Sequence, residues 1–337
     1  MTPSNTPHPY DALTPEVVLD AVESFGVRCD GRILALNSYE NRVYQIGIED
    51  SAPLIAKFYR PERWSDAAIL EEHAFSLELS EREIPVVAPL RNEHGETLFN
   101  HDNFRFALFP RYGGHAPEFE DPEHLRVIGR FLGRIHGVGG TKQFKHRPRL
   151  NVQRFGWESI ATLEASPHVP RETCKTYVAI ARACLERIES LPVTLNDVRM
   201  LRIHGDCHQG NILWRDDRAH FVDLDDSLTG PAIQDFWMLL CGARDEMMRQ
   251  LDHLLAGYEM FQLFDPREIA LIEPLRTLRL IHYNAWLARR WDDPAFPPTF
   301  PWFTGPGYWN QQIAILQEQL AQMSDAPPAV EEDFEWD

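Results

Sequence analysis

The sequence has 337 residues, of which 44% are hydrophobic and 25% charged. This is typical of a globular protein with two lobes or two domains. The formal net charge of −18 argues against nucleic-acid binding, because such surfaces neutralise phosphates with Lys and Arg. No apolar run approaches the roughly 20 residues that span a bilayer, and the polar segment 1–10 lacks the pattern of a signal peptide. We therefore expect a cytoplasmic protein that binds neither nucleic acid nor membrane.

The five cysteines are scattered along the chain and include no CxxC pair. In a cytoplasmic protein this pattern favours reduced thiols over a disulfide framework or a zinc site. The cysteines are Cys29, Cys174, Cys184, Cys207 and Cys241.

The N-terminal third carries alternating helix and strand signals. Thr14-Pro15-Glu16 predicts a helix start, because Thr caps the helix, Pro fits its first turn and an acid complements its dipole. Period-2 and helical patterns predict five strands and one further helix. The strands are expected within 33–59 and at 85–90 and 104–110, and the helix at 66–79. We therefore expect a loose leader over residues 1–13 and an N-terminal lobe over 14–112.

Helical signals dominate after Tyr112-Gly113-Gly114. Asp121-Pro122 is expected to begin one helix, and the remaining helical stretches are expected at 151–190, 232–292 and 310–323. We predict a C-terminal lobe over 113–325 and an acidic, disordered tail over 326–337. The order of elements predicts an α+β fold, with a small antiparallel-sheet lobe followed by a mainly helical one.

The segment from His204 to Asn211 reads H-G-D-x-x-x-G-N and precedes a short hairpin that ends at Asp223. If the hairpin turn is centred near Asp217, Asn211 and Asp223 face each other across the two strands. Cross-strand neighbours lie about 4.5–5.5 Å apart at Cβ. An amide oxygen and a carboxylate at that spacing can share one magnesium ion. Asp206 would project into the same open end.

These residue types suit phosphoryl transfer, in which an Asp orients the acceptor hydroxyl while an Asn and a second Asp hold metal on the phosphates. His204 and His208 are four residues apart, as in some metal sites. Since no third ligand lies at a sensible spacing, we interpret both as structural, with His204 holding the loop by hydrogen bonding.

These motifs, together with Leu132–His136 and Asp235, resemble the aminoglycoside and choline phosphotransferase branch of the protein-kinase-like superfamily. The resemblance covers most of the chain and implies a two-lobed, protein-kinase-like fold. Three segments, Ser38–Gln45, Lys57–Pro61 and Glu71–His73, resemble a bacterial subfamily of monomeric Ser/Thr protein kinases linked to survival under stress.

That resemblance also implies roles for individual residues. Asp206 would accept the hydroxyl proton, and Asn211 and Asp223 would bind magnesium. Asp223 would in addition be an active residue, and Ser38 would lie at the ATP site. By analogy, Asp235 would brace the catalytic loop.

The residues themselves also indicate a nucleotide site. Lys57 is expected to end a strand between apolar neighbours and to pair with phosphate, with Glu72 preferred over Glu71 as its acidic partner. The segment Phe109–Tyr112, including Arg111, is expected to be the hinge that meets adenine. The turn 37–41 contains no G-x-G-x-x-G, although backbone amides and the Ser38 hydroxyl can still contact phosphate.

We expect a Ser/Thr protein kinase that uses ATP and Mg²⁺ and acts on a protein hydroxyl. One alternative is a small-molecule hydroxyl kinase of the aminoglycoside, choline or homoserine type. The acidic composition and the aromatic segment 296–309 favour that alternative, since carboxylates and aromatic rings bind ammonium groups. The acidic charge also fits solubility alone, and the aromatic segment also fits packing. A nucleotide-binding scaffold without transfer activity is a third possibility, but the intact site argues against it.

Overall fold

A computed structural model describes residues 10–324 of the chain. The predicted tail 326–337 and residues 1–9 of the predicted leader lie outside the described residues. The described residues form two compact units. The first comprises 10–148, 201–229 and 238–262, and the second comprises 149–200, 230–237 and 263–324. This division does not test the predicted lobes 14–112 and 113–325, which stay a prediction.

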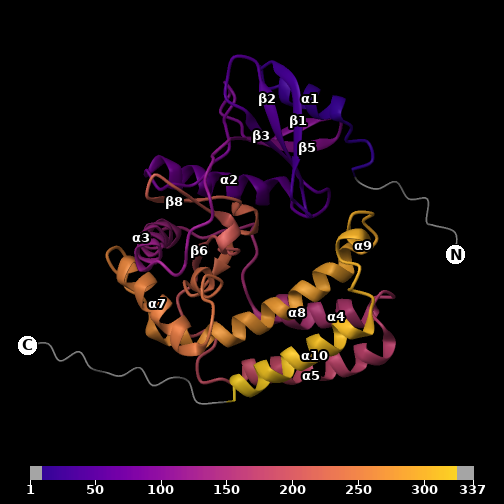
Figure 1. Cartoon of the computed structure of the whole chain (residues 1–337), viewed down its shortest axis with the longest axis vertical. Coiled ribbons are helices and arrows are strands. Elements are labelled where there is room, and N and C mark those ends of the chain that lie inside the picture. Colours follow the sequence, from indigo (N-terminus) through magenta and orange to yellow (C-terminus); the bar gives the residue numbers. More distant parts are fainter. Residues whose placement is uncertain (1–9, 325–337) are drawn as a thin grey trace, which may run out of the picture. The chain divides into compact units, whose positions relative to one another are not determined.

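A five-stranded antiparallel sheet forms the N-terminal part of the first unit, with the strand order β1-β2-β3-β5-β4 (Figure 1). This sheet and the helices that surround it confirm the predicted α+β class. The strands are β1 (Cys29–Leu36), β2 (Arg42–Ile48), β3 (Leu54–Phe58), β4 (Phe99–His101) and β5 (Phe104–Pro110).

Helices pack on both faces of this sheet. Helix α1 (Pro15–Glu23) begins where the Thr14 hydroxyl accepts the N–H of Val17, as the capping pattern predicts. Its apolar residues share a core with Ala56 and Phe58 of β3. Helix α2 (Asp66–Glu81) contributes Ile69 to a second core, formed with the other face of the sheet.

Two sequence predictions for this region are wrong. Tyr10 and Leu13, expected in a loose leader, are buried in the core beside α1. The segment 85–90 is not a strand of the sheet. Only Val86 forms a bridge, and it pairs with Phe221. The apolar pattern of 85–90 is typical of a buried strand because residues such as Val86 pack in the interior, whereas the three-residue strand β4 is too short to give a periodic signal.

The predicted hairpin is formed by β7 (Ile212–Arg215) and β8 (Arg218–Phe221), but its register differs by one residue from the prediction. Asp216 and Asp217 both adopt positive φ, at 52° and 55°, as in a two-residue type I′ turn. The turn is therefore centred between them. Asn211 faces Val222, whose N–H donates to its carbonyl at 3.0 Å, and the predicted direct pairing of Asn211 with Asp223 is wrong.

The first unit also contains two helices in close contact, α3 (Pro122–Gly139) and α7 (Arg244–Tyr258). A Cβ atom on Gly129 of α3 would lie 1.9 Å from the backbone oxygen of Leu254 in α7. Glycine at this position therefore permits the close approach. The next strand, β6 (Leu201–Ile203), packs on α3 and leads into the His204 motif.

Helices make up most of the second unit, as the periodicity predicted. Its buried aromatic residues include Phe296, Phe303 and Trp309, each 0% exposed, so the segment 296–309 largely packs into the core. The elements are η1 (Gln153–Trp157), α4 (Glu158–Ala165), α5 (Arg171–Glu189), α6 (Gln234–Trp237), η4 (Pro266–Leu271), α8 (Ile272–Arg290), α9 (Phe296–Thr299) and α10 (Pro306–Gln322).

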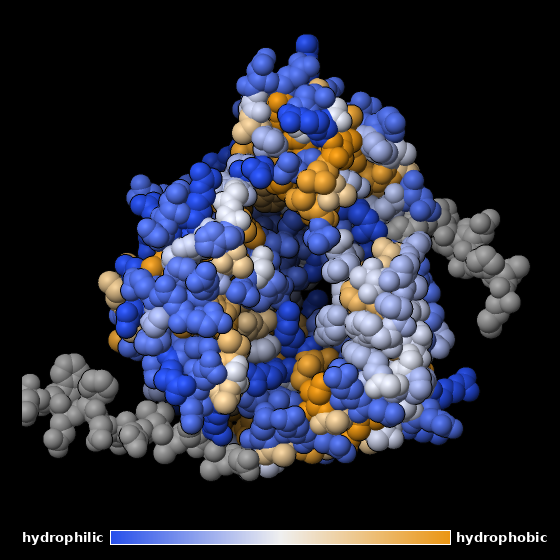
Figure 2. Space-filling model, in the orientation of Figure 1, coloured by the Kyte–Doolittle hydropathy of each residue, from blue (hydrophilic) through white to orange (hydrophobic). Residues whose placement is uncertain are grey.

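Hydrophilic residues cover much of the face shown in Figure 2, and apolar residues gather over the sheet. Leu34 and Leu36 of β1 are among the exposed large apolar side chains. Within residues 10–324, no helix combines the length and the apolar character needed to cross a membrane. All five cysteines are free thiols, as the sequence predicted.

Candidate active site

The turn that carries Asp206 follows β6 and is held by its neighbours. Gly205 has φ of 85°, and a Cβ there would lie 2.3 Å from the backbone oxygen of Asp226. Only glycine fits this position without strain. His204 donates from Nε2 to the carbonyl of Val222 (2.9 Å) and accepts the N–H of Asp206 at Nδ1 (3.4 Å). The predicted role of His204 in holding the loop is thereby confirmed.

Asn211 ends the short turn η2 (Gln209–Asn211) after Asp206. Its side-chain NH₂ group donates to the carbonyl of Asp206 at 2.9 Å, which fixes the orientation of the amide. His208 accepts the N–H of Gly210 at 3.0 Å, and its Nε2 lies 3.5 Å from Oδ2 of Asp206. The motif thus forms a compact, internally hydrogen-bonded turn.

Asp223 follows β8 and adopts a left-handed conformation, with φ 58° and ψ 64°. Its side chain is 52% exposed, and its Oδ1 accepts a hydrogen bond from Nζ of Lys57 at 2.6 Å. These two residues are 166 positions apart in the sequence. The fold therefore joins the predicted phosphate-binding lysine to a predicted metal ligand.

Lys57 lies on β3, and its side chain is 8% exposed. Burial alone would lower the pKa of Lys57, but the carboxylates of Asp223, Asp225 and Glu72 raise it above the ordinary value. Its Nζ also lies 5.5 Å from the centre of the Phe109 ring. A permanently charged amine in this position is suited to bind phosphate.

The two candidate acids on α2 occupy different environments. Glu72 is 2% exposed, and burial raises its pKa to about 7, against the opposing charge of Lys57. The carboxylate of Glu71 instead accepts the backbone N–H groups of residues 145–147 at 2.7–2.9 Å. Glu72 therefore interacts electrostatically with Lys57, whereas Glu71 anchors a loop.

The remaining predicted residues lie around the same sheet. Ser38 is partly exposed in the loop between β1 and β2. Phe109 is on β5, opposite Ile55 of β3. Arg111 follows β5 and donates to the side-chain oxygen of Gln45 at 2.9 Å. Asp235 is buried in α6 of the second unit, and its bracing role stays a prediction.

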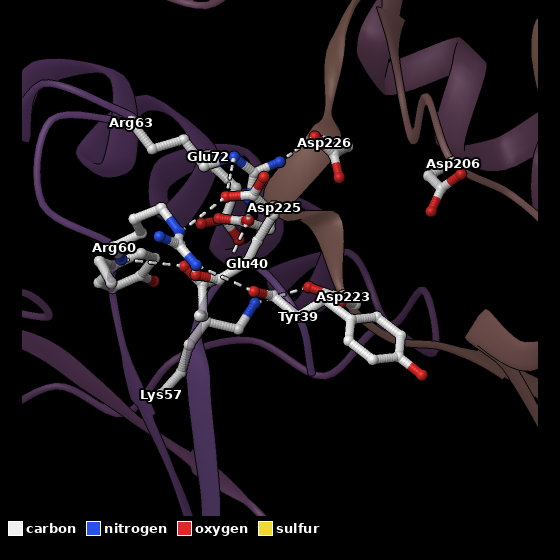
Figure 3. A network of polar contacts seen from close by, with 12 residues as sticks. Tyr39, Glu40, Lys57, Arg60, Arg63, Glu72, Asp206, Asp223, Asp225 and Asp226 are labelled. Atoms are coloured by element: carbon white, nitrogen blue, oxygen red, sulfur yellow. Dashed lines mark hydrogen bonds and ion pairs between the residues drawn. The ribbon is translucent and has the colours of Figure 1, made fainter. Parts of the chain in front are cut away.

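A polar network that the sequence pattern did not predict lies beside Asp223, as shown in Figure 3. Asp225 is 3% exposed and pairs with Arg63 and Asn41. Burial alone would raise the pKa of Asp225, but the charge of Arg63, followed by those of Lys57 and Arg147, lowers it well below its usual range. The sequence signal for this network is charge complementarity, because two arginines, Arg60 and Arg63, follow β3 and an acidic run at 223–226 follows β8.

The donor groups of Asn211 and Asp223 fit a hard divalent cation. An amide oxygen and a carboxylate are the ligand types that magnesium prefers, and the Asp223 side chain is half exposed. Because the NH₂ group of Asn211 is held by Asp206, its oxygen is the end of the amide turned away from that bond. Among the described residues, no group of three or more His, Cys, Asp or Glu side chains could hold a metal ion.

Sequence comparisons support the same reading. Residues 32–272 match the model of the phosphotransferase enzyme family. Stress response kinase A of Escherichia coli (strain K12) is 45% identical over 325 residues, which are 96% of this chain and 98% of that protein. The serine/threonine protein kinase RdoA of Salmonella typhimurium is 44% identical over 318 residues, which are 94% and 96% of the two chains.

Solved structures share the fold at low sequence identity. The amicoumacin kinase hAmiN, in complex with AMP-PNP, Ca²⁺ and Ami, matches with a TM-score of 0.68 and 18% identity over 88% of this chain and 90% of that one. A microcompartment-associated aminopropanol kinase matches with a TM-score of 0.70 and 14% identity, over 93% and 100% of the two chains. The predicted kinase-like fold is therefore confirmed.

Proposed function

Because this chain belongs to the phosphotransferase enzyme family, and within it to the group of stress response kinases A, we propose that it is a Ser/Thr protein kinase. It transfers the γ-phosphoryl group of ATP to a protein hydroxyl in a stress response, as the names of its relatives suggest. We expect it to act as a cytoplasmic monomer with Mg²⁺ as its metal.

The observation that carries the proposal is the contact between Lys57 and Asp223 at 2.6 Å. It unites a buried cation on the sheet with a carboxylate at the end of the hairpin, in the same compact unit as Asp206. Phosphoryl transfer depends mainly on positioning and on stabilising phosphate charge, and these residue types supply both.

Each residue has a proposed task in the reaction. Asp206 accepts the proton of the acceptor hydroxyl. The hydroxyl oxygen forms a bond to the γ-phosphorus of ATP, and the bond between the γ-phosphorus and the β,γ-bridging oxygen breaks. Lys57 binds phosphate oxygens, and the carboxylate of Glu72 on α2 favours its charged form. Asn211 and Asp223 would hold the magnesium ion, which neutralises charge on the phosphates.

The nucleotide would lie along the sheet. Phe109 and Arg111 are proposed to flank the adenine-binding hinge. Ser38 would donate its hydroxyl to phosphate from the loop between β1 and β2, in place of a glycine-rich turn.

A protein acceptor is favoured over a small amine. The aromatic segment 296–309, with the acidic composition, favours recognition of an ammonium group, but Phe296, Phe303 and Trp309 are fully buried, although Trp302 is 40% exposed. The protein-kinase name of a relative that is 44% identical points the same way.

The test incubates the pure protein with γ-labelled ATP, Mg²⁺ and a generic basic protein. We expect label on the acceptor or on the kinase itself. Parallel reactions contain an amino alcohol or an aminoglycoside, with ATP consumption as the readout. Transfer to a small molecule without any transfer to protein would refute the protein-kinase assignment.

Two Asp→Asn variants sharpen this test. Asp206→Asn should lower transfer by at least 10²-fold while ATP binding stays nearly unchanged, because it removes the proton acceptor and keeps the shape. Asp217→Asn is the matched control, since it lies in the exposed hairpin turn at positive φ, which Asn tolerates. Full activity of the Asp206 variant would show that its assigned role is wrong.

A further inference from the structure

The segment that carries Asp223 is irregular. Asp223 occupies a left-handed conformation, which is uncommon for non-glycine residues although Asp adopts it more readily than most. The chain then makes the short turn η3 (Leu224–Asp226). Side chains from other parts of the first unit contact this segment and hold it in place.

Arg63, in the loop between β3 and α2, supplies such contacts. One of its terminal nitrogens pairs with Oδ2 of Asp225, and the other lies 2.5 Å from Oδ1 of Asp226. The side chains of Arg63 and Asp225 are 13% and 4% exposed, so this ion pair is poorly screened by solvent, whereas the side chain of Asp226 is 47% exposed. A planar guanidinium is suited to this double contact, whereas a lysine amine is a single point charge.

A second arginine holds the same segment through its backbone. Arg147 donates from Nε to the carbonyl of Ser227 at 2.8 Å, and one of its terminal nitrogens donates to the carbonyl of Asp225. Its guanidinium lies 4.2 Å from the centre of the Trp64 ring. Arg147 thus fixes the backbone, whereas Arg63 compensates the two acidic side chains.

Asp225 also joins this segment to the loop that contains Ser38. Nδ2 of Asn41 donates to Oδ2 of Asp225 at 3.0 Å, and Oδ1 of Asn41 accepts the N–H of Arg60 at 3.2 Å. Asn41 is 4% exposed. The carboxylate of Asp225 therefore contacts Arg63 in the loop after β3 and Asn41 in the loop between β1 and β2.

Arg60 strengthens the attachment of that loop. It donates from Nε to the carbonyl of Glu40 at 2.9 Å and from a terminal nitrogen to the carbonyl of Tyr39 at 3.1 Å. The loop between β1 and β2 is therefore tied down by side chains. These contacts hold the loop that is proposed to cover the phosphates, in a chain that lacks glycines at this position.

We propose that Arg63 is a positioning residue for phosphoryl transfer. It holds Asp225 and Asp226 so that Asp223 is presented to the metal and Asn41 keeps the loop containing Ser38 in place. This inference rests on the proposed function. Without Arg63, the buried carboxylate of Asp225 would lose its main compensating charge beside two other acids, and the segment that carries Asp223 would shift to relieve the repulsion.

The test compares Arg63→Gln and Arg63→Lys with a matched surface control, Arg32→Gln. Arg32 pairs only locally with Asp30, and its side chain is 77% exposed. Two quantities are measured: the Mg²⁺ concentration needed for half-maximal binding of AMP-PNP, followed by calorimetry, and the kcat and KM for ATP. The binding arm needs no acceptor, so it stays informative even if no transfer to protein is found.

We expect Arg63→Gln to raise the Mg²⁺ requirement about 10- to 100-fold, the usual effect of removing a residue that orients a metal ligand. Arg63→Lys should recover part of this loss, and Arg32→Gln should match the wild type. If Arg63→Gln fails to fold, the Lys variant carries the test. A folded Arg63 variant with the wild-type Mg²⁺ requirement and KM for ATP would overturn the proposal and leave Arg63 a purely structural role.

Discussion

Replacing Glu71 or Glu72 with Gln, one at a time, tests whether the two acids have the different roles that the structure indicates. The carboxylate of Glu71 accepts the N–H of Lys145 at Oε1 (2.7 Å) and those of His146 and Arg147 at Oε2 (2.7 and 2.9 Å). In Gln, one oxygen becomes an NH₂ group, which would face a backbone N–H. At least one charge-assisted hydrogen bond is therefore lost.

Each such bond is worth about 1.5–3 kcal/mol. We thus expect Glu71→Gln to lower the free energy of unfolding by about 2–3 kcal/mol and the Tm by several degrees. The partial burial of Glu71 would raise its pKa, but the three backbone N–H groups lower it. This stabilisation is present above the pKa of the unfolded state and is lost as pH falls through the pKa of the folded state. The difference from the wild type should therefore shrink on acidification.

Glu72→Gln should behave in the opposite way. It removes a buried carboxyl group whose pKa is raised to about 7 and whose ionised form is therefore disfavoured in the folded state. The free energy of unfolding at pH 8 should thus be unchanged or higher. The KM for ATP should rise about tenfold or more, because Lys57 loses its acidic neighbour on α2. Circular dichroism gives the Tm, and kinase assays give the KM. If Glu71→Gln raised the KM as much as Glu72→Gln, with an unchanged Tm, our separation of the two acids would be wrong.

Three further predictions concern packing, pH and metal. Gly129→Ala should lower the free energy of unfolding, measured in urea, by about 2–4 kcal/mol, since the new Cβ would meet the backbone of α7. Gly137→Ala on the same helix should lower it much less, because the nearest atoms to its new Cβ belong to the flexible side chain of Gln262. Burial raises the pKa of Glu268 to about 7. The folded state therefore binds the extra proton, and stability falls as pH rises from about 4.5 to 7. Glu268→Gln should lack this part of the slope when Tm is followed against pH, and an unchanged slope would contradict the assignment. Chelation with EDTA should abolish phosphoryl transfer, and added Mg²⁺ should restore it. Asn211→Ala should need about 10- to 100-fold more Mg²⁺ for half-maximal transfer. If this variant needed no more Mg²⁺ than the wild type, Asn211 would be excluded as a ligand.

The local signals in the sequence were reliable where they depend on neighbouring residues. The cap at Thr14, the helices and the turn between β7 and β8 follow from backbone preferences that act over a few positions. The H-G-D motif indicated the chemistry because Gly205 and Asp206 form a local turn. A shift of one residue in the hairpin was still enough to misplace the partner of Asn211, since both Asp216 and Asp217 adopt positive φ.

The sequence by itself determined the class of fold and the residue types of the candidate site. Tertiary structure decided which side chains meet. Lys57 reaches Asp223 across 166 positions, and Arg63 reaches Asp225 across 162. Such pairings depend on how distant segments pack, which local preferences do not encode. The same holds for Glu71 and Glu72, which share a helix and differ only in what the fold places around each carboxylate.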